Sequence, residues 1–136
     1  MPVADSFGAD WPQWRGPGRD GKSAESGLLG EWPAEGPALL WRVEGVGGGY
    51  SSLSIVDGRI FTMGDIGDTQ YVLAMSEDAG EHLWKTPIGP RWEDQYGGPR
   101  ATPTVDGDHV YAMGTQGDLV CLEAETGKEV WRRSRT

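Results

Sequence analysis

An internal repeat constrains the fold of this chain more than any other feature. The tripeptide Val-Asp-Gly at residues 56–58 returns at residues 105–107, and the stretch 80–84 returns as 127–131, about 50 residues later each time. A period of about 40–50 residues that carries several short strands is typical of β-propeller blades and of comparable repeat arrays. The repeat therefore indicates the fold more clearly than any single residue indicates a chemistry.

Each copy contains four short runs of β-branched, aromatic and large apolar residues. The runs are Ser52–Val56, Arg59–Met63, Gln70–Met75 and Glu81–Lys85, then Ala101–Val105, His109–Met113, Leu119–Glu123 and Lys128–Arg133. Turn residues separate them, and Asp-Gly at 57–58 and 106–107 is a strong hairpin signal because glycine adopts positive φ at little cost. No helical period is sustained, so the chain is predicted to be all-β, with about two four-stranded blades.

A third, incomplete copy precedes the two complete ones. Residues 39–43 (Leu-Leu-Trp-Arg-Val) resemble the last run of each copy, so we predict one extra outer strand there. The predicted organisation is an extended N-terminal arm over 1–37 and propeller repeats over 38–136, with blade units at about 50–86 and 99–134. Closed propellers use about four to eight blades. Two blades are therefore expected to be a fragment of a longer protein, or a protomer that completes its ring by association.

Composition excludes several classes of protein. The net charge is −9, with 12 basic and 21 acidic residues, which disfavours nucleic acid as a partner. Cys121 is the single cysteine, so no internal disulfide forms, and its position corresponds to that of Ala74 in the first copy. No run of apolar residues is long enough for a transmembrane helix, and residues 1–20 lack the apolar stretch of a signal peptide.

The repeat residues resemble a known family. Residues 119–131 (Leu-Val-Cys-Leu-Glu-Ala-Glu-Thr-Gly-Lys-Glu-Val-Trp) are similar to the repeat of pyrroloquinoline-quinone-like (PQQ-like) β-propellers, and residues 72–84 form a looser version. Residues 11–17 (Trp-Pro-Gln-Trp-Arg-Gly-Pro) and 98–104 resemble the same bacterial group. The resemblance implies about eight blades and a periplasmic or secreted location. Some members are quinoprotein dehydrogenases, and others are assembly factors that bind proteins.

Two functions follow from this resemblance. The first is a noncatalytic scaffold for protein or ligand binding and assembly in the cell envelope, whose partners are the missing blades or another protein. The second is part of a PQQ-dependent dehydrogenase of alcohols or sugars, with PQQ and calcium held by residues in missing blades. The chain has no adjacent cysteines and no asparagine. We therefore predict no catalytic residue, metal ligand or cofactor within this chain itself.

The tryptophan near the end of each repeat is expected to serve packing. Trp84 and Trp131 lie on the predicted outermost strands, where an indole fills the widening gap between radially arranged blades. The glycine four residues earlier allows the tight turn that brings this strand back. Both tryptophans are thus predicted to have equivalent surroundings between blades, and Trp41 is expected to behave in the same way.

Ligand binding, if present, is expected in the loops that enter the innermost strands. The loops 47–51 and 91–100 occupy equivalent positions ahead of each repeat. The second loop combines aromatic and charged side chains suited to a polar, planar or anionic group. Trp92, Tyr96 and Arg100 are the candidate binding residues, and the alternative is that the loop only covers the channel rim.

Residues 16–23 match the phosphate-binding pattern G-x-x-x-x-G-K-[ST]. That loop requires a buried strand before it and a helix after it, so that the amides of the helix N-terminus face the phosphates. Here the preceding residues include a proline and no apolar strand, and the following residues are rich in glycine. We therefore favour an exposed extended arm over a nucleotide site.

Overall fold

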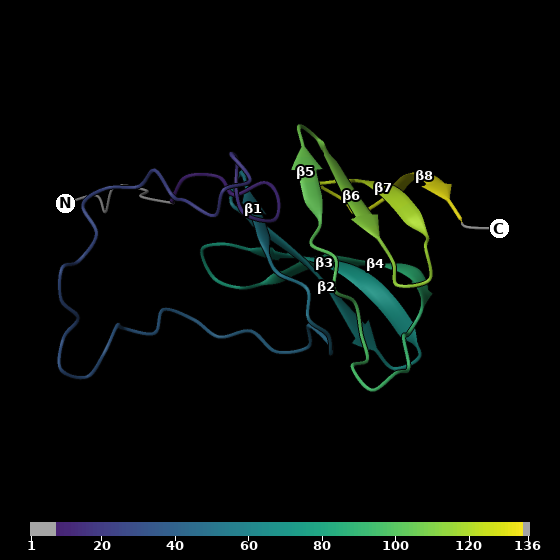
Figure 1. Cartoon of the computed structure of the whole chain (residues 1–136), viewed down its shortest axis with the longest axis horizontal. Helices are drawn as coiled ribbons and strands as arrows, with labels where there is room; N and C mark the ends of the chain where they lie inside the picture. Colours follow the sequence, from purple (N-terminus) through teal and green to yellow (C-terminus); the bar gives the residue numbers. More distant parts are fainter. Residues whose placement is uncertain (1–7, 135–136) are drawn as a thin grey trace.

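The computed structural model describes residues 8–134, which form two four-stranded antiparallel sheets (Figure 1). The strands are β1 (Ser54–Val56), β2 (Arg59–Ile66), β3 (Thr69–Ser76), β4 (His82–Pro90), β5 (Thr104–Asp106), β6 (His109–Met113), β7 (Leu119–Glu123) and β8 (Glu129–Arg133). Each sheet is a meander in chain order, so blade 1 (β1–β4) and blade 2 (β5–β8) confirm the predicted propeller fold. Residues 1–7 of the predicted arm, and 135–136, lie outside the described residues.

The predicted runs and the observed strands agree closely in blade 2 and less closely in blade 1. The runs at β6 and β7 coincide with the strands, whereas β2 continues to Ile66 and β4 to Pro90. The turn between the predicted runs Arg59–Met63 and Gln70–Met75 is therefore shorter than expected. Asp65 and Ile66 pair with Gln70 and Thr69, because Gly67 at φ 59° closes a tight turn after them.

An apolar core lies between the two blades. Its buried members alternate along the strands of both sheets: Phe61, Met63, Val72, Ala74, Ile88, Val105, Val110, Ala112, Val120, Leu122 and Ala124. This period of two places one face of each blade toward the other. Burying a side chain of this size contributes about 1.5–3 kcal/mol to stability, so this interface dominates the stability of the pair.

Residues 39–43, predicted to be an extra outer strand, are extended and pair with no strand among residues 8–134. The predicted partners belong to a preceding blade, so this strand stays a prediction. A ladder needs a neighbouring edge with free backbone groups, and no strand lies beside it. The segment nevertheless makes the contact predicted for Trp41. The indole of Trp41 packs on Gly80, and its Nε1 donates a hydrogen bond to the carbonyl of Glu77 over 3.0 Å.

The same contact recurs one blade later. The indole of Trp84 packs on Gly127, and its Nε1 donates to the carbonyl of Ala124 over 3.0 Å. Gly80 and Gly127 both have positive φ and lie in the turn between the third and fourth strands of their blades. Each outer tryptophan therefore docks on the last turn of the following blade, and a side chain at that glycine would collide with the ring.

The N-terminal residues run along the strands at which the blades approach each other. The backbones of Trp11 and Ile55 form an isolated antiparallel bridge, and residues 24–40 then extend away from the sheets before Trp41 returns to blade 1 (Figure 1). This segment carries apolar side chains that are largely exposed: Leu28, Leu29, Trp32, Leu39 and Leu40. Among residues 8–134, no helix has the length and apolarity needed to cross a bilayer.

Candidate functional site: a cleft between the blades

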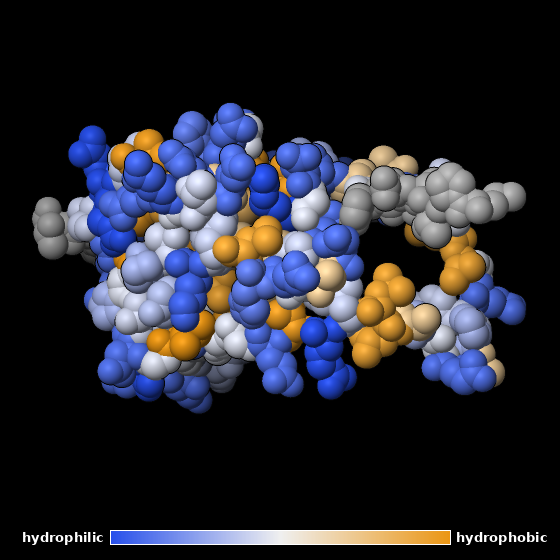
Figure 2. All heavy atoms as spheres, turned by 180° about the vertical axis from the view of Figure 1, so that it is seen from behind, coloured by the Kyte–Doolittle hydropathy of each residue, from blue (hydrophilic) through white to orange (hydrophobic). Residues whose placement is uncertain are grey.

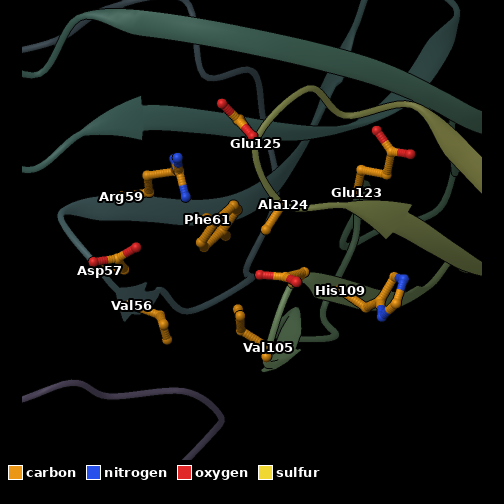
Figure 3. Close-up of a pocket in the computed structure, with 11 residues that line it drawn as sticks. Val56, Asp57, Arg59, Phe61, Val105, His109, Glu123, Ala124 and Glu125 are labelled. Carbon is orange, nitrogen blue, oxygen red and sulfur yellow. The ribbon is translucent and has the colours of Figure 1, made fainter.

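A cleft opens between blades 1 and 2 at the end of the sheets where their first hairpins turn (Figure 3). It encloses about 520 Å³. The turns after β1, β5 and β7 position its walls, which therefore come from both blades. The lining residues are Val56, Asp57, Arg59 and Phe61 from blade 1, and Val105, Gly107, Asp108, His109, Glu123, Ala124 and Glu125 from blade 2.

The two hairpin turns on the cleft are equally long, but they lie one position apart relative to the repeated Val-Asp-Gly sequence. Asp57 (φ 52°) and Gly58 (φ 73°) form the two-residue turn of blade 1, which is the geometry of a primed turn. The corresponding prediction for blade 2, a turn at 106–107, is wrong, because Asp106 pairs with His109 in the ladder. Both ladders have three pairs, but blade 2 has one extra residue after Val-Asp-Gly, which moves its turn to 107–108. Asp108 rather than Asp106 therefore lines the cleft.

Acidic side chains outnumber basic ones around the cleft: Asp57, Asp108, Glu123 and Glu125 against Arg59 and His109. Figure 3 shows Phe61 and Ala124 at its centre, with Asp57 and Arg59 on one side and His109 and Glu123 on the other. Phe61 and Ala124 belong to the buried core. An apolar floor below carboxylates suits a segment that carries both aliphatic and cationic side chains, since charge-assisted hydrogen bonds add to apolar contact.

Sequence reasoning did not identify this cleft. It interpreted Asp57 only as part of a hairpin turn, since aspartate favours turns whatever their position, and Glu123 only as the end of a strand. A usable signal exists, since acidic residues follow the first and third strands of both copies. Antiparallel meanders bring those turns to the same end of a blade, and neighbouring blades then place them side by side.

The two loops predicted to carry binding lie together at a different place. The amide of Tyr50 donates to the carbonyl of Pro99 over 2.7 Å, and the rings of Tyr50 and Tyr96 meet edge-on with centroids 6.4 Å apart. Gly98, at φ 94°, lies against the backbone of Gly49. The loops 47–51 and 91–100 thus form one continuous rim.

The three candidate residues on this rim do not converge on one point. Trp92 lines a shallow pocket of about 310 Å³ with Arg91 and Asp65, but Tyr96 and Arg100 do not line it. Arg100 donates from Nη2 to the carbonyl of Tyr96 over 2.6 Å. Within residues 8–134, the buried indole Nε1 of Trp92 has no hydrogen-bond acceptor.

The carboxylate beside Trp92 is already engaged. Asp65 accepts from the side-chain amide of Gln70 over 2.9 Å and from the backbone amide of Trp92 over 3.1 Å. Across residues 8–134, no three His, Cys, Asp or Glu side chains lie close enough together to hold a metal ion. Calcium binds six to eight oxygens, so the residues described here do not fit the calcium site of a quinone-dependent enzyme.

Gln70 is a buried polar connection between the blades that sequence reasoning missed. Its side chain is 1% exposed. Its Nε2 donates to Asp65 and, over 3.1 Å, to the hydroxyl of Thr115, and its Oε1 accepts from the amide of Thr115 over 3.0 Å. The side chain therefore ties β3 of blade 1 to the β6–β7 turn of blade 2, beneath the rim.

One carboxyl group near the arm has a shifted pKa. Burial raises the pKa of Glu77, and the negative charges of Asp10 and Glu25 raise it further. Glu77 follows β3 in blade 1, and its backbone carbonyl accepts the hydrogen bond of Trp41. Its counterpart in blade 2 is Ala124, so this acid is peculiar to the first blade.

The repeat is matched by a protein family. Residues 68–135 match the family model described as outer membrane protein assembly factor BamB. BamB of Aliivibrio fischeri (strain ATCC 700601 / ES114) is 34% identical over 59 residues, which are 40% of this chain and 15% of that protein. The chain therefore spans a small part of the curated relative that it matches.

Solved structures share the fold. The crystal structure of BamB from Moraxella catarrhalis aligns with a TM-score of 0.54 and 17% identity, over 71% of this chain and 27% of that one. The quinohemoprotein alcohol dehydrogenase ADHIIG from Pseudomonas putida HK5 aligns with a TM-score of 0.52 and 21% identity, over 73% of this chain and 15% of that one. At these identities the likeness shows the fold alone.

Proposed function

Because this chain belongs to the PQQ-like repeat family described as outer membrane protein assembly factor BamB, we propose that its blades are a noncatalytic scaffold that binds another protein. The curated relative named above is an assembly factor. The proposal places the protein in the cell envelope, as an extracytoplasmic binding module. It also makes residues 38–134 consecutive blades of a ring of about eight, with residues 39–43 supplying the outer strand of the preceding blade.

The inter-blade cleft is the observation that carries this proposal. It is open, its carboxylates come from turns of both blades, and its floor is apolar. Such a surface binds an extended segment with alternating aliphatic and basic side chains, because the apolar floor gives affinity and the carboxylates give specificity. Turns on a rigid sheet scaffold are also where binding residues are commonly found.

Two synthetic peptides test this function. One alternates leucine with arginine and the other alternates leucine with glutamate, so that they differ only in the sign of their charge. We expect the arginine peptide to shift the NMR signals of Arg59 and His109, with an affinity that falls as salt rises. Equal binding of both peptides would contradict the proposal.

A matched pair of variants locates the binding. Asp108→Asn with Glu125→Gln removes two carboxylates from the cleft, and Glu31→Gln with Glu35→Gln removes two exposed carboxylates from the extended segment. Both changes alter the net charge equally. The first is expected to weaken the arginine peptide about tenfold and the second by less than about twofold. Similar losses in both would show that only overall charge matters.

A second candidate function rests on the pocket beside Trp92. The ring of Trp92 and the guanidinium of Arg91, which pairs with Glu93 over 2.7 Å, line this pocket and suit a polar, planar or anionic ligand. This keeps Trp92, Tyr96 and Arg100 as proposed binding residues, and part of a PQQ-dependent dehydrogenase as the alternative function. Titration of the full-length protein with quinone and calcium, followed by absorbance and dye reduction, separates the two. Dye reduction would overturn the noncatalytic scaffold.

A further inference from the structure

The free edges of β1 and β5 lie where the two blades come closest. These two strands are the first of their sheets, and they are the strands through which the sheets contact each other most. The hydroxyl of Ser54 on β1 donates to the carbonyl of Pro103, just before β5, and both residues are fully buried. In a radial arrangement of blades, this side of the sheets faces the central axis.

Each of these edges offers backbone groups for strand addition. Ile55 pairs with Ile60 on β2 and Val105 pairs with Val110 on β6, so the two residues occupy equivalent positions before their turns. Their backbone amides point away from the neighbouring strand, because residues alternate along an antiparallel ladder. An unpaired edge of this kind is a template for another polypeptide.

The chain's own N-terminal arm already occupies both positions. The amide of Trp11 donates to the carbonyl of Ile55 over 2.7 Å, and the carbonyl of Trp11 accepts from the amide of Ile55 over 2.9 Å. The carbonyl of the next residue, Pro12, accepts from the amide of Val105 over 2.8 Å. Two successive residues of the arm therefore pair with blade 1 and then with blade 2.

Further contacts hold the arm in this position. A carboxylate oxygen of Asp10 accepts from the amide of Asp57 over 3.1 Å. The indole of Trp11 packs on Gly16, a buried residue at φ 79° where a Cβ atom would lie 2.7 Å from the ring. Trp14, in contrast, is 57% exposed and covered by the guanidinium of Arg15.

The arm also fixes itself by its own backbone bonds. The carbonyl of Gln13 accepts from the amide of Gly16 over 2.9 Å, and the carbonyl of Arg15 accepts from the amide of Gly21 over 3.0 Å. No helix follows, and these amides are paired within the arm. The phosphate-loop pattern at 16–23 is therefore part of a compact turn that braces the paired residues.

We propose that residues 10–12 are a built-in cap that occupies the strand-addition site on the axial edges of both blades. Another polypeptide can pair with β1 or β5 only after displacing this cap, since Ile55 has one outward amide and one outward carbonyl and both are taken. The expected competitor is an extended peptide that adds as a strand. The cap thus protects the edges from unwanted pairing and makes axial binding a competition with the arm.

Amide hydrogen exchange on the whole chain gives the first test. The amides of Ile55 and Val105 are expected to exchange at least about a hundredfold more slowly than those of unpaired residues, because the cap must open before exchange. Exchange of these two amides at the rate of unpaired residues would overturn the proposal without any variant being made.

Two tryptophan variants give the second test. Trp11→Ala removes the ring that packs on Gly16, while Trp14→Ala removes the same type of side chain from an exposed position of the same arm. The first is expected to raise the exchange rates of the Ile55 and Val105 amides about tenfold, and the second to leave them unchanged. Exchange at Val120, inside the β6–β7 ladder, should change in neither. Equal effects of the two variants would contradict a specific cap.

A peptide added in trans completes the test. A labelled peptide of residues 8–23 is expected to bind the Trp11→Ala chain at least tenfold more tightly than the unaltered chain, whose edges are occupied. The same peptide methylated on the Trp11 backbone nitrogen keeps the indole and loses the donor, so it should not bind. Equal binding to both chains, or binding of the methylated peptide, would overturn the proposal.

Discussion

Two tryptophans at the same position of the repeat have different surroundings. Trp84 packs on Gly127 of the following blade and donates to the carbonyl of Ala124. Within their own blades the two rings are alike, since Trp84 lies 6.0 Å from Phe61 and Trp131 lies 6.1 Å from Tyr111 between ring centroids. Trp131, however, packs on no following turn among the described residues and is 39% exposed. The prediction of equivalent surroundings is therefore wrong for this pair, although it holds for Trp41 and Trp84.

The difference shows where the environment of a repeat residue comes from. The strand of each tryptophan is built by its own blade, but the turn that receives the indole belongs to the next blade. The outward face of blade 2 accordingly leaves Met113 half exposed, whereas its counterpart Met63, which faces blade 2, is 4% exposed. Figure 2 shows apolar patches on the molecular surface. A repeat unit thus supplies a side chain, and its neighbour supplies the burial.

Replacing the two tryptophans is the most direct way to break the comparison. Trp84→Ala is expected to lower the free energy of unfolding by about 4 kcal/mol, because it removes a large ring from the interface and leaves the Ala124 carbonyl without its donor. Trp131→Ala should cost less than about 1 kcal/mol. Urea unfolding followed by far-UV circular dichroism measures both, and equal losses would refute the argument that the neighbour determines the contribution.

Substituting the receiving glycine probes the same contact from the other side. Gly127→Ala places a methyl group against the Trp84 ring at φ 74° and is expected to cost about 3 kcal/mol. Gly107, at φ 58° with open space around it, is the matched control, for which only backbone strain of about 1 kcal/mol is expected. In a Trp84→Ala background the Gly127→Ala cost should fall toward that of the control, with a remainder from the Thr86 hydroxyl, which lies 2.8 Å from the same Cβ position. A cost that stays unchanged would show that the glycine does not act through the ring.

Features that are local in sequence were predicted, and features that need a neighbour were not. The alternating runs and glycine turns gave the strands of both blades, because a hairpin is specified within a few residues. The outer strand at 39–43 stays a prediction, because a ladder depends on a partner strand and none lies beside this segment in the described part of the chain. The pairing of Trp11 with Ile55 could not be predicted from the sequence, because the proline-containing arm has no strand pattern and the two residues are far apart in the chain.

The candidate binding surfaces were likewise predicted only in part. The loops 47–51 and 91–100 could be found because aromatic and charged residues cluster in the second of them, and both lie on the rim. The cleft could not be found, because its carboxylates come from turns of two blades and each turn alone looks ordinary. One extra residue before β6 also decided which aspartate, Asp106 or Asp108, faces it.

Gln70 sharpens the comparison by showing a polar contact between the same two blades. Gln70→Ala is expected to cost about 2 kcal/mol, because the Thr115 amide and hydroxyl and the Asp65 carboxylate lose a shared partner in a buried place. Gln95→Ala, on the exposed part of the rim, is the control and should change stability by less than about 0.5 kcal/mol. If both variants unfold at the same urea concentration, the blades are held by their apolar core and tryptophan alone.

The smallest effect concerns the two residues that accept the indole hydrogen bonds, Glu77 in blade 1 and Ala124 in blade 2. Burial and the charges of Asp10 and Glu25 raise the pKa of Glu77 above its ordinary value of 4.5, so the folded chain binds this proton more tightly than the unfolded chain. The stability associated with this proton is complete below pH 4.5 and is lost as the pH rises through the raised pKa.

Glu77→Gln should therefore stabilise the chain at pH 7, by less than about 1 kcal/mol because water screens this partly exposed group. It should also flatten the decline of stability above pH 4.5. Glu81→Gln, at the exposed residue just before β4, is the control. If the unfolding free energy of Glu77→Gln depends on pH in the same way as that of the unaltered chain, the arm carboxylates do not act on Glu77.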